Sequence, residues 1–353
     1  MKKEVYCDHL FVDRITKDPP LYSAFNEESL QKHQCWANFC LLLLNSHLHF
    51  NMSPNEFFIK TTSNPFYKEL QKRRSNGSCK VDFDINSFED LASSLPDLNA
   101  LYLVSINKNK AEELSQKNGV LIIPASDYSS YSFIFKDTGK TISIKDPNIK
   151  SWDFLKCNKK NICNSMIIVD NFLLNDKNTM KENLKSLFIS LLPDCLDEGI
   201  SFQLAFYAIL KDGQKVDIDI KRIYDDILGL LNEVKKEERK KLNVSLTIYK
   251  CKLNRFGDPK RFHGRVIITN DYIINCDGGL DLFKCGKSQK LAVINIVYPN
   301  ITKEIEWAGN AYEDYLKEAK EETNESEPYD KDKHFLPGRY IGDKKMRLWD
   351  LLE

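Results

Sequence analysis

The sequence predicts an α/β protein made of two domains. Its 353 residues exceed what a single hydrophobic core usually organises, and short apolar runs alternate with longer amphipathic segments along the chain. A polar stretch rich in Lys and Asn, residues 156–164, separates two such halves. We therefore expect an N-terminal α/β domain at 1–155, a second domain at 165–305, and a charged helix or linker with a C-terminal docking tail at 306–353.

The first half contains a β-α-β pattern. LYLVS at 101–105 and VLIIP at 120–124 predict strands, and residues 109–117 between them predict a helix. This order is typical of a Rossmann-like parallel sheet. The other elements expected here are a strand within 4–15, a core helix at 27–44, a short helix at 88–94, and a hairpin with strands 131–135 and 141–144 around a turn at 137–139.

The second half also alternates between strand and helix patterns, which predicts a second α/β domain. The expected helices are 178–192 and 218–241, and the expected strands are 165–174, 200–210, 244–251, 265–269, 272–275 and 291–297. Residues 311–334 are charged and low in apolar content, which predicts an exposed helix leading into a linker.

Composition argues for a cytoplasmic protein. Lys and Arg number 51, as do Asp and Glu, so the net charge gives no signal for nucleic acid or membrane over the whole chain. The ten Cys residues form no C-x-x-C pair, which is typical of a reducing compartment. We find no apolar run long enough for a signal peptide or a membrane span. Abundant Lys, Asn and Ile indicate an AT-rich bacterial genome.

One stretch, residues 261–283, combines an imidazole, guanidinium groups, carboxylates and a glycine pair. His263 and Arg265 are two residues apart, so in a strand their side chains point to the same face. Gly278 and Gly279 permit a tight bend whose backbone N–H groups approach a ligand. Arg binds phosphate through two parallel hydrogen bonds. The stretch therefore predicts a site for phosphate or a similar anion, without a cofactor or a metal.

The same stretch resembles the phospholipase D superfamily, whose motif reads H-x-K-x4-D-x6-G-S-x-N. His263-Gly-Arg265 is similar to the H-x-K element, and Gly-Gly-Leu-Asp at 278–281 falls where the family has G-S-x-N. The strand that ends at Asp170 is similar to the D-x-Y-L strand of that family. The resemblance covers roughly residues 165–300 and is to degenerate domains with one such motif. It implies a mixed sheet flanked by helices.

The candidate site residues follow from the stretch and from the resemblance. They are His263 and Asp271 for catalysis, Arg261, Arg265, Gly278 and Gly279 for phosphate binding, and Asp170 and Asp281 as supporting residues. Active members of the family combine two motifs and this chain has one, so the resemblance implies that turnover requires a homodimer. The leading hypothesis is phosphate recognition without hydrolysis, with nucleic acid as the ligand, within a bacterial defence system.

Two alternatives from other functional classes stay open. The first is a homodimeric phosphodiesterase or nuclease that uses His263. The second is an interaction module that binds a protein partner through the C-terminal tail. The mixture of Arg, Lys and Phe at 254–262 favours nucleic acid over lipid, because such side chains both neutralise phosphates and stack on bases.

Two metal interpretations concern the first half. Acidic residues at strand ends could hold a divalent metal, in an arrangement similar to PIN-like nucleases: Asp8, Asp13, Asp82, Asp84 and Asp127. A zinc interpretation draws on His33, Cys35, Cys40, His47 and His49. Cys35 and Cys40 lie in an apolar helical run, so we expect core thiols there and no metal site.

Overall fold

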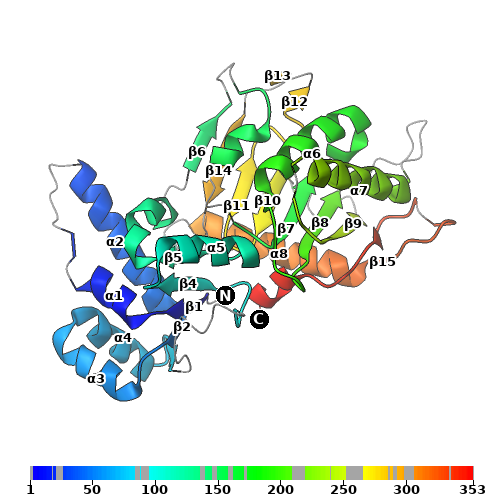
Figure 1. Ribbon diagram of the computed structural model, residues 1–353. Helices are drawn as coiled ribbons and strands as arrows, with labels where there is room; N and C mark the ends of the chain where they lie inside the picture. The colour runs from blue at the N-terminus through cyan, green and yellow to red at the C-terminus, as the bar shows by residue number, and fades with distance from the viewer. Residues whose placement is uncertain are drawn as a thin grey trace. The chain divides into compact units, whose positions relative to one another are not determined.

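The computed structural model describes residues 3–17, 19–20, 27–83, 88, 95–135, 140–144, 149–157, 162–170, 173–208, 219–238, 240–251, 265–284, 287–288, 292–297, 306–333 and 335–352. The chain divides into two compact units, and each is built around its own sheet (Figure 1). The first unit comprises 1–139 and 298–309, and the second comprises 140–297 and 310–353.

The first unit contains a five-stranded sheet in the order β3-β2-β1-β4-β5, with every neighbouring pair parallel. Its strands are β1 (Glu4–Cys7), β2 (His47–Phe50), β3 (Lys80–Asp82), β4 (Leu101–Val104) and β5 (Ile122–Pro124). The expected β-α-β pattern is confirmed, because β4 and β5 pair in parallel and helix α5 (Lys108–Asn118) connects them. The order of the strands reverses between β1 and β4.

Local capping determines where the helices of this unit begin and end. These helices are α1 (His9–Thr16), α2 (Glu27–Asn45), α3 (Pro54–Ser63), α4 (Pro65–Ser75) and α5. Asp8 caps α1 by accepting the Leu10 amide at 2.9 Å, so the expected strand at 4–15 ends at Cys7. A capping box of Ser53 and Glu56 begins α3, which the sequence analysis missed.

The first strand of the hairpin expected at 131–135 and 141–144 is wrong, and the turn expected at 137–139 lies outside the described residues. Residues Ala125–Phe135 form a 3₁₀ helix (η2) instead. The second expected strand exists as β6 (Lys140–Ser143), but it pairs with β14 (Val293–Val297) in the second unit. The alternation of Ile142 and Ile144 with polar residues was therefore a true strand signal. The strand's partner lies far along the chain, because the Thr141 side chain bonds Asn295, 154 residues away.

The second unit contains a nine-stranded mixed sheet in the order β15-β16-β9-β8-β7-β10-β11-β14-β6. Strands β7, β8 and β9 are parallel to one another, and β10, β11, β14 and β6 add antiparallel pairs. The bounds are β7 (Ser165–Asp170), β8 (Phe202–Ala208), β9 (Val244–Lys250), β10 (Arg265–Thr269), β11 (Ile273–Cys276), β15 (Glu327–Pro328) and β16 (Arg339–Ile341). A separate pair is formed by β12 (Phe283–Lys284) and β13 (Lys287–Ser288).

Helices cover both faces of this sheet. The first face is covered by α6 (Lys177–Leu191) and α7 (Ile220–Glu237), which lie side by side in Figure 1. On β8, Phe206 packs against Phe188 of α6, while the hydroxyl of the next residue, Tyr207, bonds Thr323 of α8 (Glu306–Glu325). Successive side chains of a strand point to opposite faces, so α6 and α8 cover opposite faces. Short 3₁₀ helices η3 (Trp152–Cys157) and η4 (Leu173–Asn175) contact α6.

The helix expected within 311–334 exists as α8 (Glu306–Glu325), but its expected exposure is wrong. Tyr312, Leu316 and Ala319 of α8 are fully buried, at spacings of four and three residues that place them on one helix face. The charged residues between them hid this face from the sequence analysis. The helix therefore belongs to the core of the second unit.

The C-terminal segment is part of the second unit as well. Strand β16 pairs with β9 and continues to the 3₁₀ helix η5 (Arg347–Leu352), whose Leu348 and Leu351 are buried. The Arg347 guanidinium donates to the carbonyl and side-chain oxygens of Asn164, at 3.3 and 2.6 Å. Within the described residues, no helix is both long and apolar enough to span a membrane.

Candidate functional site

The structure brings together only some of the residues predicted for the anion site. Arg265 begins β10 and lies opposite Asp170, the last residue of β7. Gly278 and Gly279 follow β11 at the same end of the sheet, because β10 and β11 form an antiparallel hairpin. Asp271 lies in the turn at the other end, beyond roughly 14 Å of strand at about 3.4 Å per residue. Asp271 therefore lies apart from the group that it was expected to join. Arg261, His263 and Asp84 lie outside the described residues.

The glycine turn packs closely against Arg265. The Arg265 Nη1 donates to the Asp277 carbonyl oxygen at 2.7 Å. A Cβ on Gly279, whose φ is +94°, would lie 3.6 Å from Arg265 Nε and 2.5 Å from Asp281 Oδ1. A Cβ on Gly278 would lie 2.6 Å from the Cβ of Ala292. Local packing thus requires glycine at both positions.

Two backbone amides of this turn are used within the protein. Gly279 donates to the Cys276 carbonyl at 3.4 Å, and Leu280 donates to Asp170 Oδ2 at 2.9 Å. The other oxygen of Asp170 accepts the Leu173 amide at 2.8 Å, so this buried carboxylate joins the ends of β7 and β11. The expected nest of ligand-binding amides is therefore reduced. Among the described contacts, the Arg265 guanidinium uses one of its five N–H donors.

The acidic residues of the first unit do not form one metal cluster among the described residues. Asp8 accepts the amides of Leu10 and Ser105, at 2.9 and 3.3 Å. Asp13 pairs with Lys60, and Asp127 lies 3.0 Å from Lys108 Nζ. Of these three carboxylates only Asp8 directly follows a strand, since Asp13 lies in α1 and Asp127 in η2, and each already has partners within the protein.

The residues of the zinc interpretation do not form one cluster either. Cys35 and Cys40 are buried on α2, which confirms their assignment as core thiols. Burial raises the pKa of Cys40 to about 12, so the thiolate that binds zinc is disfavoured. The two histidines of β2, in contrast, meet a residue that the sequence analysis did not single out, Glu4 of β1.

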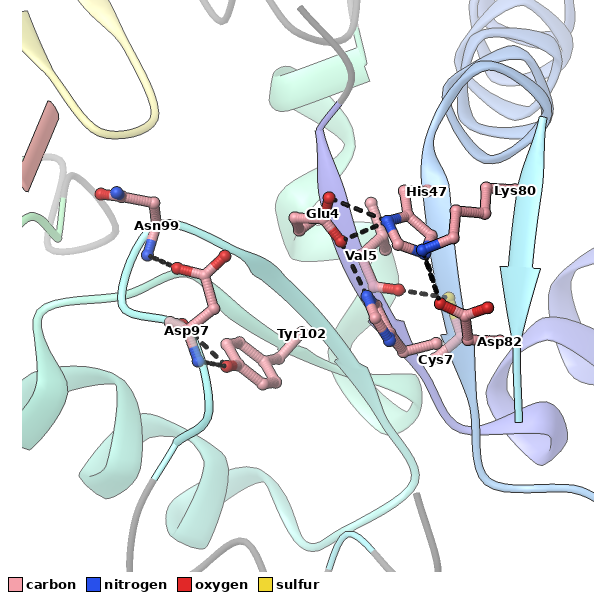
Figure 2. A network of polar contacts seen from close by, with 10 residues as sticks. Glu4, Val5, Cys7, His47, Lys80, Asp82, Asp97, Asn99 and Tyr102 are labelled. Carbon is pink, nitrogen blue, oxygen red and sulfur yellow. Dashed lines mark hydrogen bonds and ion pairs between the residues drawn. The ribbon is translucent and has the colours of Figure 1, made fainter. Parts of the chain in front are cut away.

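Glu4, His47 and His49 form one cluster on a face of the parallel sheet. Figure 2 shows Glu4 and His47 pointing toward each other from β1 and β2. In the register of β1 and β2, Glu4 lies directly opposite His47, and His49 points to the same face two residues further on. The Glu4 carboxylate is 2.9 Å from His47 Nδ1 and 2.7 Å from His49 Nε2. The His-x-His pattern at 47–49 was visible in the sequence and placed both imidazoles on one face of a strand. The third member, Glu4, could be found only once the pairing of β1 with β2 was known.

Neighbouring residues hold both imidazole rings in place. His47 Nε2 lies 2.7 Å from Asp82 Oδ2, and Lys80 Nζ lies 3.1 Å from the same oxygen (Figure 2). Partial burial acts to raise the pKa of Asp82, but the hydrogen bonds from His47 and Lys80 outweigh it, so this pKa lies below its usual value. His49 stacks on Tyr6 with ring centroids 4.4 Å apart. Asp82 thus fixes the orientation of the His47 ring, and Tyr6 fixes that of the His49 ring.

Two comparisons with known proteins found no match for this chain. No protein-family model matches it. No curated protein matches it either.

Proposed function

We propose that the second unit recognises phosphate groups, with nucleic acid as the ligand. The site lies at the end of the nine-stranded sheet where β7 finishes and β10 begins with Arg265. The carrying observation is the position of this half-buried arginine, against the Gly278–Gly279 turn and beside the carboxyl end of β7. In open α/β sheets, ligands bind outside the carboxyl ends of the parallel strands. A guanidinium with donors to spare at that edge suits a phosphate oxygen.

The basic residues between β9 and β10 in the sequence also support a phosphate site at this end of the sheet. Cys251 donates its amide to the Ala208 carbonyl at 2.9 Å, so β8 and β9 end side by side, and the next described residue is Arg265. The sequence between them carries one acid, Asp258, against four basic residues: Lys252, Arg255, Lys260 and Arg261. Neutralisation of phosphates supplies most of the affinity for nucleic acid. Phe256 and Phe262 add aromatic rings on which bases stack.

The proposal is tested by the salt dependence of binding. Fluorescence anisotropy of labelled single-stranded DNA and RNA, measured at several salt concentrations, gives the slope of log K against log salt. We expect Arg265→Gln to weaken binding and to reduce this slope by about one, the loss of one phosphate contact. Arg265→Lys keeps the charge and should keep the slope, although it loses the two-pronged geometry.

The matched control is Arg222→Gln, which removes an exposed arginine from α7 in the same unit. Circular dichroism checks that each variant folds, since Arg265 also bonds Asp277. Binding without salt dependence, or equal effects of the two Gln variants, would contradict the proposal. Hydrolysis of bis-p-nitrophenyl phosphate that is lost in His263→Ala would replace it with the phosphodiesterase alternative.

A further inference from the structure

We propose that Glu4, His47 and His49 bind a divalent transition metal, with zinc as the best fit, on the face of the parallel sheet in the first unit. The inference is independent of the phosphate proposal, which concerns the other unit. Three kinds of observation carry it: the ligand set and its geometry, the carboxylate behind His47, and the access to solvent.

The ligand atoms have the right chemistry and nearly the right spacing. One carboxylate and two imidazoles are a donor set that zinc uses in sites with three protein ligands. Their ligand atoms all lie within 4.8 Å of one another. Bonds of about 2.0–2.1 Å to a tetrahedral ion place its ligands about 3.3 Å apart. The contacts of Glu4 with His47 and His49, at 2.9 and 2.7 Å, therefore need to widen by only about half an ångström.

Asp82 occupies the place of an outer-shell carboxylate. Histidines that bind metals usually donate their other ring N–H to a carboxylate, which fixes the tautomer and the ring orientation. His47 directs Nδ1 at Glu4 and Nε2 at Asp82. A carboxylate accepts the hydrogen bond of a ring N–H, so Asp82 can hold the tautomer with its proton on Nε2, and Nδ1 is then the nitrogen that faces the ion. A metal bound at Nδ1 leaves the bond between Nε2 and Asp82 intact.

The two imidazole rings are mostly buried, whereas the Glu4 carboxylate is partly exposed to solvent. The side chains of His47 and His49 are 12% and 10% exposed, against 38% for Glu4. The Tyr6 ring lies between His49 and Tyr102, with centroid distances of 4.4 and 4.9 Å, which limits rotation of the His49 ring. An ion can thus enter from the side of Glu4, and three protein ligands leave its fourth position for water or an exogenous ligand.

The experiment is a titration of the chelator-treated full chain with Co²⁺, followed by the visible absorption of the bound ion, and then with Zn²⁺ in competition. We expect one Co²⁺ per chain at this site, displaced by Zn²⁺ and not by a large excess of Mg²⁺, which prefers oxygen ligands. His49→Gln and Glu4→Gln should each lower the affinity by more than about a hundredfold. Asp82→Asn, acting on His47 as a positioning residue, should lower it by about 10–100-fold.

His33→Gln is the control, because it removes an imidazole that lies on α2 in the same unit and is not one of the three clustered ligands. If wild-type protein binds no Co²⁺, or if Glu4→Gln and His33→Gln bind it equally well, the assignment is wrong and the cluster is a hydrogen-bonded network only. Glu4→Gln is isosteric at a partly exposed position, so it keeps the test decisive even if His49→Gln unfolds. As a second readout, Zn²⁺ should raise the Tm of wild type and not that of Glu4→Gln.

Discussion

Gly342 joins the C-terminal segment to the nine-stranded sheet at a position where no side chain fits. Its φ is +117°, and a Cβ there would lie 2.3 Å from the Leu246 carbonyl oxygen and 2.7 Å from the Thr247 Cα. Both atoms belong to the backbone of β9, which is held between β8 and β16. The obstacle therefore cannot rotate away as a side chain would. We expect Gly342→Ala to push the segment that follows β16 away from β9.

The magnitude follows from a comparison with Gly199, which also has a positive φ, +94°, but has no atom within 4 Å of a Cβ. A left-handed backbone costs a residue with a Cβ about 1–2 kcal/mol. Overpacking adds about 1–3 kcal/mol. Gly199→Ala should thus lower the free energy of unfolding by about 1–2 kcal/mol, and Gly342→Ala by about 2–5 kcal/mol. The larger loss includes the mutual bonds of Thr247 and Asp343, at 2.7 and 2.9 Å.

Urea unfolding of the two variants, followed by tryptophan fluorescence, measures both losses. Amide hydrogen exchange at Tyr249 and Tyr340, which face each other across β9 and β16, reports where the stability is lost. Faster exchange at this pair in Gly342→Ala, and not in Gly199→Ala, is the expected pattern. Equal stabilities of the two variants, within about 0.5 kcal/mol, would refute the reasoning. They would indicate that residues 339–352 are only loosely attached to the sheet.

Two further predictions concern local chemistry in the second unit. The Thr179 amide holds the pKa of its N-cap partner Asp176 below the usual value, so Asp176→Ala should lower the free energy of unfolding by about 1 kcal/mol at pH 7. A depressed folded pKa contributes above the ordinary value of about 3.9, so this difference, measured by urea unfolding, should shrink at pH 3; an unchanged difference would contradict it. Burial raises the pKa of Cys163 to about 12, whereas Cys195 is partly exposed. In a thiol assay with DTNB at pH 8, Cys195→Ser should remove one fast-reacting group and Cys163→Ser none.

Most strands and helices of both units were predictable because their signals are local. Apolar runs marked β4, β5, β7 and β9, and the long amphipathic pattern near 218–241 marked α7 (Ile220–Glu237). The errors arose where a local signal was weak. Tyr312 and Leu316 are buried on a helix that reads as charged, and residues 54–75 form two helices within a stretch broken by prolines. In α3 and α4, each Pro stands at the first helical position, where it favours a helix.

The candidate sites were predictable only in part. Residues that are close in sequence and on one hairpin end, such as Arg265 and Gly279, were correctly grouped, because strand geometry relates them directly. Asp271 was wrongly grouped with Arg265, because Asp271 lies in the turn of the β10–β11 hairpin and Arg265 lies at the open end of the same hairpin. Glu4 was missed because it lies 43 residues from His47 along the chain.

The sequence by itself determined the α/β class, the alternation of strands and helices, and the parallel β4–α5–β5 pattern. Only the tertiary structure decided which strands pair and in what register. It placed β6 and β16 in the second sheet, and it aligned Glu4 with His47. The physical reason is that side-chain periodicity specifies which face of a strand is buried, whereas pairing depends on backbone hydrogen bonds between distant segments, which any residue except proline can donate. The metal cluster proposed here exists only through such a pairing.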